Sequence, residues 1–184
     1  MLKHTENSQT MSQPPVKPSA TETRVWDYIT NKLTQTKPEL GGLPICPYAE
    51  RYRGTFIVKE SHESVNDTLA LWAKIWDPRV HTAIVLAWRY PPIESSLRGT
   101  GARLTSKGVH RTADRWANTL GDRDCEILVN HPQDPYPVAN VWTGMEGHIL
   151  IILQRESLLL AARERLQKTN YYQNWSQADL EGLV

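Results

Sequence analysis

The sequence predicts a single α+β domain, a four-stranded mixed sheet with helices packed on it. Apolar residues recur at helical spacing in four segments, and four short apolar runs rich in β-branched residues lie between or after them. The last two of these runs have no helical segment between them. Because neighbouring parallel strands need a long crossover, this order favours a mixed sheet over a purely parallel one.

Length, composition and net charge limit the class of protein to which the chain can belong. The chain has 184 residues, of which 40% are hydrophobic and 22% are charged, which is enough for one folded core. We expect residues 1–20, which are polar and contain three prolines, to form a disordered N-terminal arm, and residues 21–184 to form the domain. The net charge of +1 predicts no global attraction to nucleic acid or acidic lipid, so any such preference must be local.

The helices are expected where apolar side chains recur every three or four residues, up to a glycine or the residue before a proline. The expected helices are 23–33, 47–53, 61–76, 109–120 and 157–167. The expected strands are 55–59, 82–88, 125–130 and 148–153. The second strand is apolar without alternation, which predicts a central strand covered on both faces.

Cys46 lies between two prolines and just before the expected short helix. The dipole and the free N–H groups of a helix N-terminus favour a thiolate, so Cys46 is a candidate nucleophile, redox thiol or ligand. The run Cys46-Pro47-Tyr48 is similar to the start of a glutaredoxin active site, but Ala49 replaces the resolving cysteine and the strand follows the motif, so we reject that fold. The alternative is a small apolar cysteine packed under the sheet.

A histidine and a carboxylate follow the third expected strand. Residues at strand ends commonly face a ligand crevice, where His131 would be a general base or the ion-pair partner of a thiolate. Asp134 would orient the imidazole, which makes Cys46, His131 and Asp134 the expected catalytic set. The alternative is a polar turn in which Asp134 caps a local bend.

A basic, glycine-containing connection precedes the helix 109–120 and predicts a clamp on an anionic substrate. It is not a Walker loop, because no Gly-Lys-Ser/Thr occurs in register. The expected substrate-binding residues are Arg89, Arg98, Arg103 and Lys107, and His110, Arg111 and Arg115 extend the positive character. The alternatives are a nucleic-acid groove beside nearby aromatic residues and a solvated surface loop.

Other features narrow the class of protein. There is no Cys-x-x-Cys and no His-x-x-x-His, so no metal site is expected. Two cysteines do not make a disulfide scaffold. No run approaches roughly 18 apolar residues, and the start lacks the apolar core of a signal peptide. We therefore expect a cytoplasmic protein with no membrane partner, and the sequence leaves the oligomeric state open.

Several elements together resemble a family of small uncharacterised bacterial and marine-phage proteins with Cys-Pro-Phe/Tyr-Ala and His-Pro-x-Asp motifs. The matching elements are Trp26, the run Gly41-Gly42-Leu43-Pro44-Ile45-Cys46-Pro47-Tyr48-Ala49, His131-Pro132-Gln133-Asp134, and Tyr171-Tyr172-Gln173-Asn174-Trp175. The resemblance covers about residues 23–180, and residues 98–108 look like an insertion. The family implies no activity, but Cys46 and His131 match its two motifs, which favours them as the functional pair.

Three functions follow as hypotheses. The first is a small cysteine-dependent enzyme or redox protein that acts on an anionic small molecule through Cys46 and His131. The second is a non-catalytic accessory protein that binds a partner protein or nucleic acid through its aromatic surface and basic loop. The third is a haem-thiolate protein, because a Cys-Pro pair such as Cys46-Pro47 also ligates haem in some proteins. No cofactor is required by the first two hypotheses.

Overall fold

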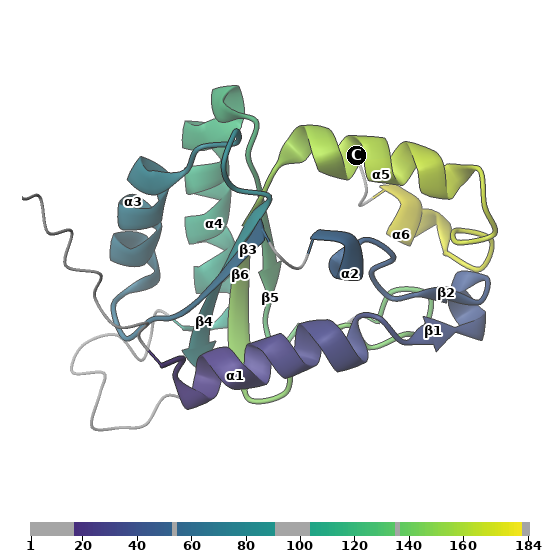
Figure 1. Ribbon diagram of the computed structural model, residues 1–184, viewed down its shortest axis with the longest axis horizontal. Helices are drawn as coiled ribbons and strands as arrows, with labels where there is room; N and C mark the ends of the chain where they lie inside the picture. The colour runs from purple at the N-terminus through teal and green to yellow at the C-terminus, as the bar shows by residue number, and fades with distance from the viewer. Residues whose placement is uncertain (1–16, 53–54, 91–103, 135–136, 182–184) are drawn as a thin grey trace, which may run out of the picture.

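The computed structural model describes residues 17–52, 55–90, 104–134 and 137–181 (Figure 1). Four strands form a mixed sheet in the order β3-β4-β6-β5, with helices packed on it, which confirms the predicted fold class. The strands are β3 (Phe56–Glu60), β4 (Ala83–Arg89), β5 (Glu126–Asn130) and β6 (His148–Gln154). β3 and β4 are parallel, and β6 is antiparallel to both β4 and β5. The last strand therefore lies between two strands that run in the same direction.

The helices of the described residues begin where serine or threonine side chains cap them, or soon after a turn. They are α1 (Ala20–Asp27), which continues into a π-helical turn (Tyr28–Lys32), α2 (Ala49–Tyr52), α3 (Val65–Ile75), α4 (Ser106–Leu120), α5 (Glu156–Gln167) and α6 (Gln177–Glu181). A short antiparallel pair, β1 (Thr36–Lys37) and β2 (Leu43–Pro44), was not predicted. Figure 1 shows α2 and this pair between α1 and α5, on the side of the sheet away from α3 and α4.

Capping explains where the helix starts differ from prediction. Ser19 and Glu22 form a capping box, so α1 starts at residue 20 and not at 23. Ser64 accepts a hydrogen bond from the N–H of Asp67 at 3.1 Å, which starts α3 at residue 65 and not at 61. Thr105 accepts one from the N–H of Gly108 at 3.3 Å, which starts α4 at residue 106 and not at 109.

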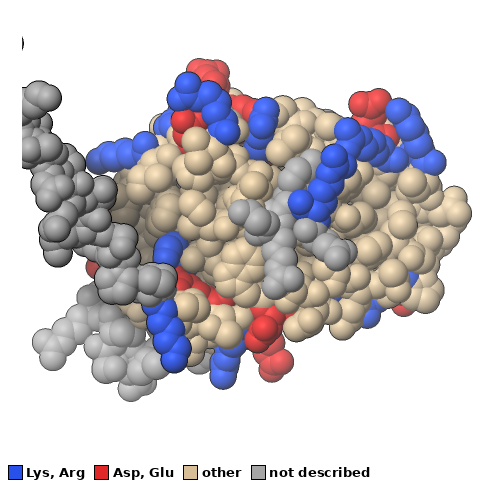
Figure 2. Space-filling model, viewed as in Figure 1, with Lys and Arg blue, Asp and Glu red and all other residues tan. Residues whose placement is uncertain are grey.

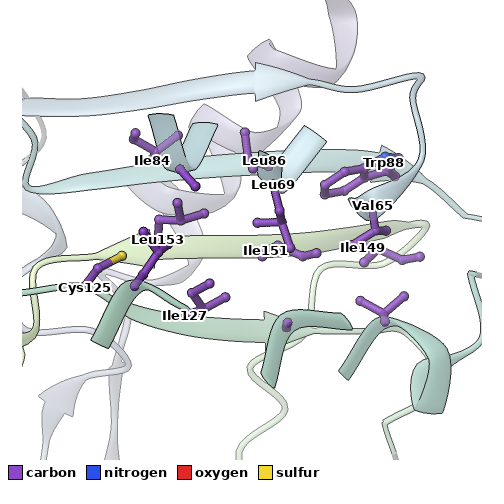
Figure 3. Close-up of a cluster of buried hydrophobic side chains, with 14 of the residues drawn as sticks. Val65, Leu69, Ile84, Leu86, Trp88, Cys125, Ile127, Ile149, Ile151 and Leu153 are labelled. Carbon is purple, nitrogen blue, oxygen red and sulfur yellow. The ribbon is translucent and has the colours of Figure 1, made fainter. Parts of the chain in front are cut away.

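The two faces of the sheet bury two apolar clusters. The first lies between the sheet and α3 and α4, where the β4 side chains Ile84, Leu86 and Trp88 point toward the helices (Figure 3). The second lies under α1 and contains Val85 and Ala87 of the same strand. β4 is thus buried from both sides, as predicted from its unbroken apolar run.

A third cluster builds the end of the molecule away from α3 and α4. Leu40 and Ile45 pack there with Ala139, Val141 and Tyr171. The Tyr171 hydroxyl donates to the backbone carbonyl of Ile45 at 2.5 Å. The aromatic tail therefore folds back on the segment that leads into Cys46.

Candidate functional site

A groove lies where α3 and α4 begin, beyond the carboxyl ends of β3 and β4. Because each of these helices follows one of two parallel strands, both helix N-termini lie at the same edge of the sheet. We call this feature the α3–α4 groove, and it has a volume of about 540 Å³. It is lined by Ser64, Val65, Asn66, Asp67, Thr105, Lys107, Gly108, Arg111, Thr112 and Arg115. That volume is in the range of small-molecule sites, and the carboxyl edge is where open α/β sheets commonly bind ligands.

Three cations line one wall of the α3–α4 groove. Lys107, Arg111 and Arg115 stand four residues apart on α4, so their side chains follow one another on one side of the helix. All three are exposed. None of them forms an ion pair with an acidic group in the part of the chain that the structure describes. No acidic partner among the described residues therefore competes with an anion from solution for these charges.

The opposite wall is polar and comes from the first turn of α3. Asp67 is the one carboxylate of the lining, and it accepts a hydrogen bond from the Ser64 hydroxyl at 2.6 Å. Asn66 accepts a hydrogen bond from the indole N–H of Trp116 at 3.1 Å, which joins the start of α3 to α4. The N-terminus of a helix carries unpaired N–H groups and a partial positive charge, so two such ends reinforce the attraction of the three cations for anions.

His131 has a structural place at the start of α4. Its side chain is 1% exposed. Nε2 lies 2.8 Å from the carbonyl oxygen of Leu104, to which it donates, and Nδ1 accepts from the N–H of Gln133 at 3.0 Å. Both ring nitrogens are thus bonded to the backbone, and Tyr90 packs edge-on against the ring at 4.9 Å. The ring has no nitrogen left to activate a thiol in this arrangement.

Among the described residues, the Asp134 carboxylate forms its hydrogen bonds with groups other than the His131 ring. Its Oδ1 accepts from the Ser106 hydroxyl at 2.5 Å, and its Oδ2 lies 3.1 Å from His110 Nε2. The same Oδ2 accepts from the backbone N–H of His131 at 3.0 Å. The Asp134 carboxylate and the His131 imidazole therefore both hold residues at the α4 N-terminus, the first through Ser106 and the second through Leu104. We call Asp134 and His131 the α4 latch.

The pKa of Asp134 makes the α4 latch sensitive to acid. Burial by itself would raise the pKa, but hydrogen bonds from Ser106 and His110 outweigh it, and the pKa lies below its ordinary value. A lowered pKa stabilises the fold above the unfolded-state value near 4, and this contribution is lost as the pH falls through the lower folded-state value. We expect Asp134→Asn to cost about 1–2 kcal/mol of unfolding free energy at pH 6. Denaturant unfolding should show this difference shrinking below about pH 4; a constant difference down to pH 2 would contradict the assignment.

Cys46 lies on the other face of the sheet, where it packs against the cluster under α1. Its backbone N–H donates to the carbonyl of Leu33 at 2.8 Å. Burial raises the pKa of the thiol, and the N–H groups of Tyr48 and Ala49 at the start of α2 lower it by less. The helix-terminus effect predicted from the sequence is present, but desolvation is larger. Among the described residues, no hydrogen bond links Cys46 to His131, whose ring nitrogens are bonded to the backbone of Leu104 and Gln133.

Alkylation kinetics test this description of Cys46. We expect iodoacetamide to modify Cys46 with a pH midpoint above the ordinary thiol value of 9.0, because burial disfavours the thiolate. Cys125, whose pKa is raised by burial to about 12, should react more slowly still. The Cys46→Ala variant assigns the signal to its residue. A midpoint below about pH 7.5 would show an activated thiolate and support the enzymatic hypothesis.

Of the four expected substrate-binding residues, the structure describes Lys107 and Arg89, and it places them at different sites. Lys107 lines the α3–α4 groove. Arg89 lies at the end of β4, where its Nε is 3.4 Å from Glu60 and 3.2 Å from the Thr21 hydroxyl, so it joins α1 to the sheet. Arg98 and Arg103 lie outside the described residues. The wall formed by the start of α3 was not predicted, because its place opposite α4 depends on the tertiary fold.

Away from the groove, positive and negative side chains lie near one another on the surface. The face shown in Figure 2 carries blue and red side chains close together at its upper edge, with uncharged surface between these groups.

Within the described residues, no cluster of three or more His, Cys, Asp or Glu could hold a metal ion. No helix in that part of the chain is both long and apolar enough to span a bilayer.

Comparison of the chain with family models, with curated proteins and with solved structures finds no match. The resemblance to the bacterial and marine-phage family therefore stays a prediction.

Proposed function

We propose that this protein binds phosphate-bearing ligands in the α3–α4 groove. One observation carries the proposal: Lys107, Arg111 and Arg115 line a groove at two helix N-termini and have no acidic partner among the described residues. Guanidinium groups recognise phosphate oxygens with paired hydrogen bonds, and helix N-termini favour the same anions.

The lining favours binding over catalysis. Among the described residues that line the groove there is neither a cysteine nor a histidine. Its single carboxylate, Asp67, is engaged by the Ser64 hydroxyl. A groove that offers cations, hydroxyls and backbone N–H groups can hold a phosphate, but it lacks an evident general base. The accessory-protein hypothesis is therefore the one that the geometry supports best.

The test is equilibrium binding by the full chain at low salt. The probes are tripolyphosphate, a nucleoside triphosphate and a fluorescein-labelled oligonucleotide. We expect at least one probe to bind, and we expect neutral replacements of the three cations to abolish that binding. If none of the probes binds at 50 mM salt, the proposal is wrong.

The cysteine-dependent enzyme and the haem-thiolate protein stay predictions. Neither gains support from the surroundings of Cys46, where burial raises the pKa of the thiol. An absorption spectrum of protein purified without chelator tests the haem hypothesis, because a Soret band that disappears in Cys46→Ala would establish it.

A further inference from the structure

We propose that the ligand of the α3–α4 groove is the phosphate backbone of a single-stranded nucleic acid. This inference rests on the proposed function, because it names the class of ligand for the same site. It is carried by the arrangement of the three cations, by the polar lining of the groove and by the exposure of the cationic side chains.

The three cations form a row and do not converge on one point. Lys107, Arg111 and Arg115 follow one another along α4 at intervals of about 6 Å and span about 12 Å. A single phosphate is held best by donors that converge on it, whereas a row of cations contacts successive anionic groups along a chain. The first turn of α4 adds backbone N–H groups at the Lys107 end of the row.

The described lining contains no aromatic platform for base stacking, and only the guanidinium planes of Arg111 and Arg115 could stack on a base. Among its described residues there is no aromatic ring, and Val65 is the only one with a large apolar side chain. A strand that contacts the row through several phosphates gains its affinity from the backbone, so binding does not depend on an aromatic platform. A duplex is a wide, stiff rod, and a concave site between two packed helices suits a single strand better.

The exposure of the cations predicts how binding depends on salt. An exposed ion pair contributes little on its own, so measurable affinity requires several simultaneous contacts. Phosphate contacts release counterions, and log K falls with log salt at a slope of about −0.7 for each phosphate contacted on a single strand. Three contacts therefore predict a slope of about −2.

Fluorescence anisotropy with labelled oligothymidylates of two to ten nucleotides tests the inference. We expect affinity to rise steeply up to about four nucleotides, which cover the row, and to fall about 20-fold between 50 and 200 mM salt. Arg111→Gln should reduce that loss to about sevenfold, since two contacts remain. Arg24→Gln is the matched control, because Arg24 is an exposed residue of α1 on the other side of the sheet. Its salt dependence should equal that of the wild type.

Competition distinguishes this inference from the proposed function. Tripolyphosphate, a long polyphosphate or a duplex that binds as tightly as the oligonucleotide, and is weakened by Arg111→Gln, would overturn the single-strand inference and leave phosphate binding in place. Oligonucleotide binding with an unchanged salt slope in Arg111→Gln would place the strand elsewhere and overturn the inference. Failure of every probe to bind would overturn both.

Discussion

Replacing His131 with alanine is expected to lower the free energy of unfolding by about 3 kcal/mol. The substitution removes the donor to the Leu104 carbonyl and the acceptor for the Gln133 N–H, and it leaves a cavity beside Tyr90. Buried polar groups that lose their partner cost more than the net value of the hydrogen bond, which is why the effect is large. Urea unfolding measured by tryptophan fluorescence gives the difference directly.

The matched control for this prediction is His62→Ala. His62 is exposed, so its replacement should change the free energy of unfolding by no more than about 0.5 kcal/mol. The His131 variant should also bind the groove ligand more weakly at a temperature where it is fully folded, because the α4 latch positions the cations. A loss below 1 kcal/mol with unchanged affinity would show that His131 is not the structural residue described here.

The combined substitution Lys107→Gln, Arg111→Gln and Arg115→Gln is expected to abolish binding of phosphate-bearing ligands. Each exposed contact contributes about 1 kcal/mol or less, so the loss of all three should weaken binding at low salt by up to about 100-fold. The three side chains are exposed and have no acidic partner among the described residues. Stability should therefore change by less than about 1 kcal/mol, so the variant separates binding from folding.

A charge-matched variant controls for net charge. Arg24, Lys74 and Arg165 are exposed cations outside the groove lining, and replacing all three with glutamine changes the net charge by the same amount. If the protein attracts phosphates only through its total charge, both variants will lose affinity equally. Loss confined to the groove variant supports the site, and equal loss contradicts it.

The fold class could be predicted because it depends on local patterns. The unbroken apolar run of β4 predicts a central strand, and the direct succession of β5 and β6 predicts a mixed sheet. The insertion of β6 between β4 and β5 could not be predicted, because strand order depends on pairing between distant segments. The pair β1 and β2 was missed because strands of two residues leave no period in the sequence.

The candidate site was predictable only in part, and the reason differs for each residue. The helix-terminus argument for Cys46 is correct locally, but desolvation decides its pKa, and burial is a property of the tertiary fold. The partner of His131 is the backbone of Leu104. The two residues lie far apart in the sequence, so the spacing of motifs could not predict this contact. Lys107 was named as a candidate, but its alignment with Arg111 and Arg115 on one helix was not predicted, because the expected helix began at residue 109. A threonine cap at residue 105 was the signal that would have included it.

The central claim is that the α3–α4 groove binds phosphates, and amide chemical-shift mapping tests it most directly. Adding a short oligothymidylate to ¹⁵N-labelled full-length protein should shift the amide signals of residues 64–67 and 105–115 and leave those around Cys46 unchanged. The groove triple variant should show no such shifts. Shifts centred on Cys46 and Tyr48, or shifts that persist in the triple variant, would contradict the claim.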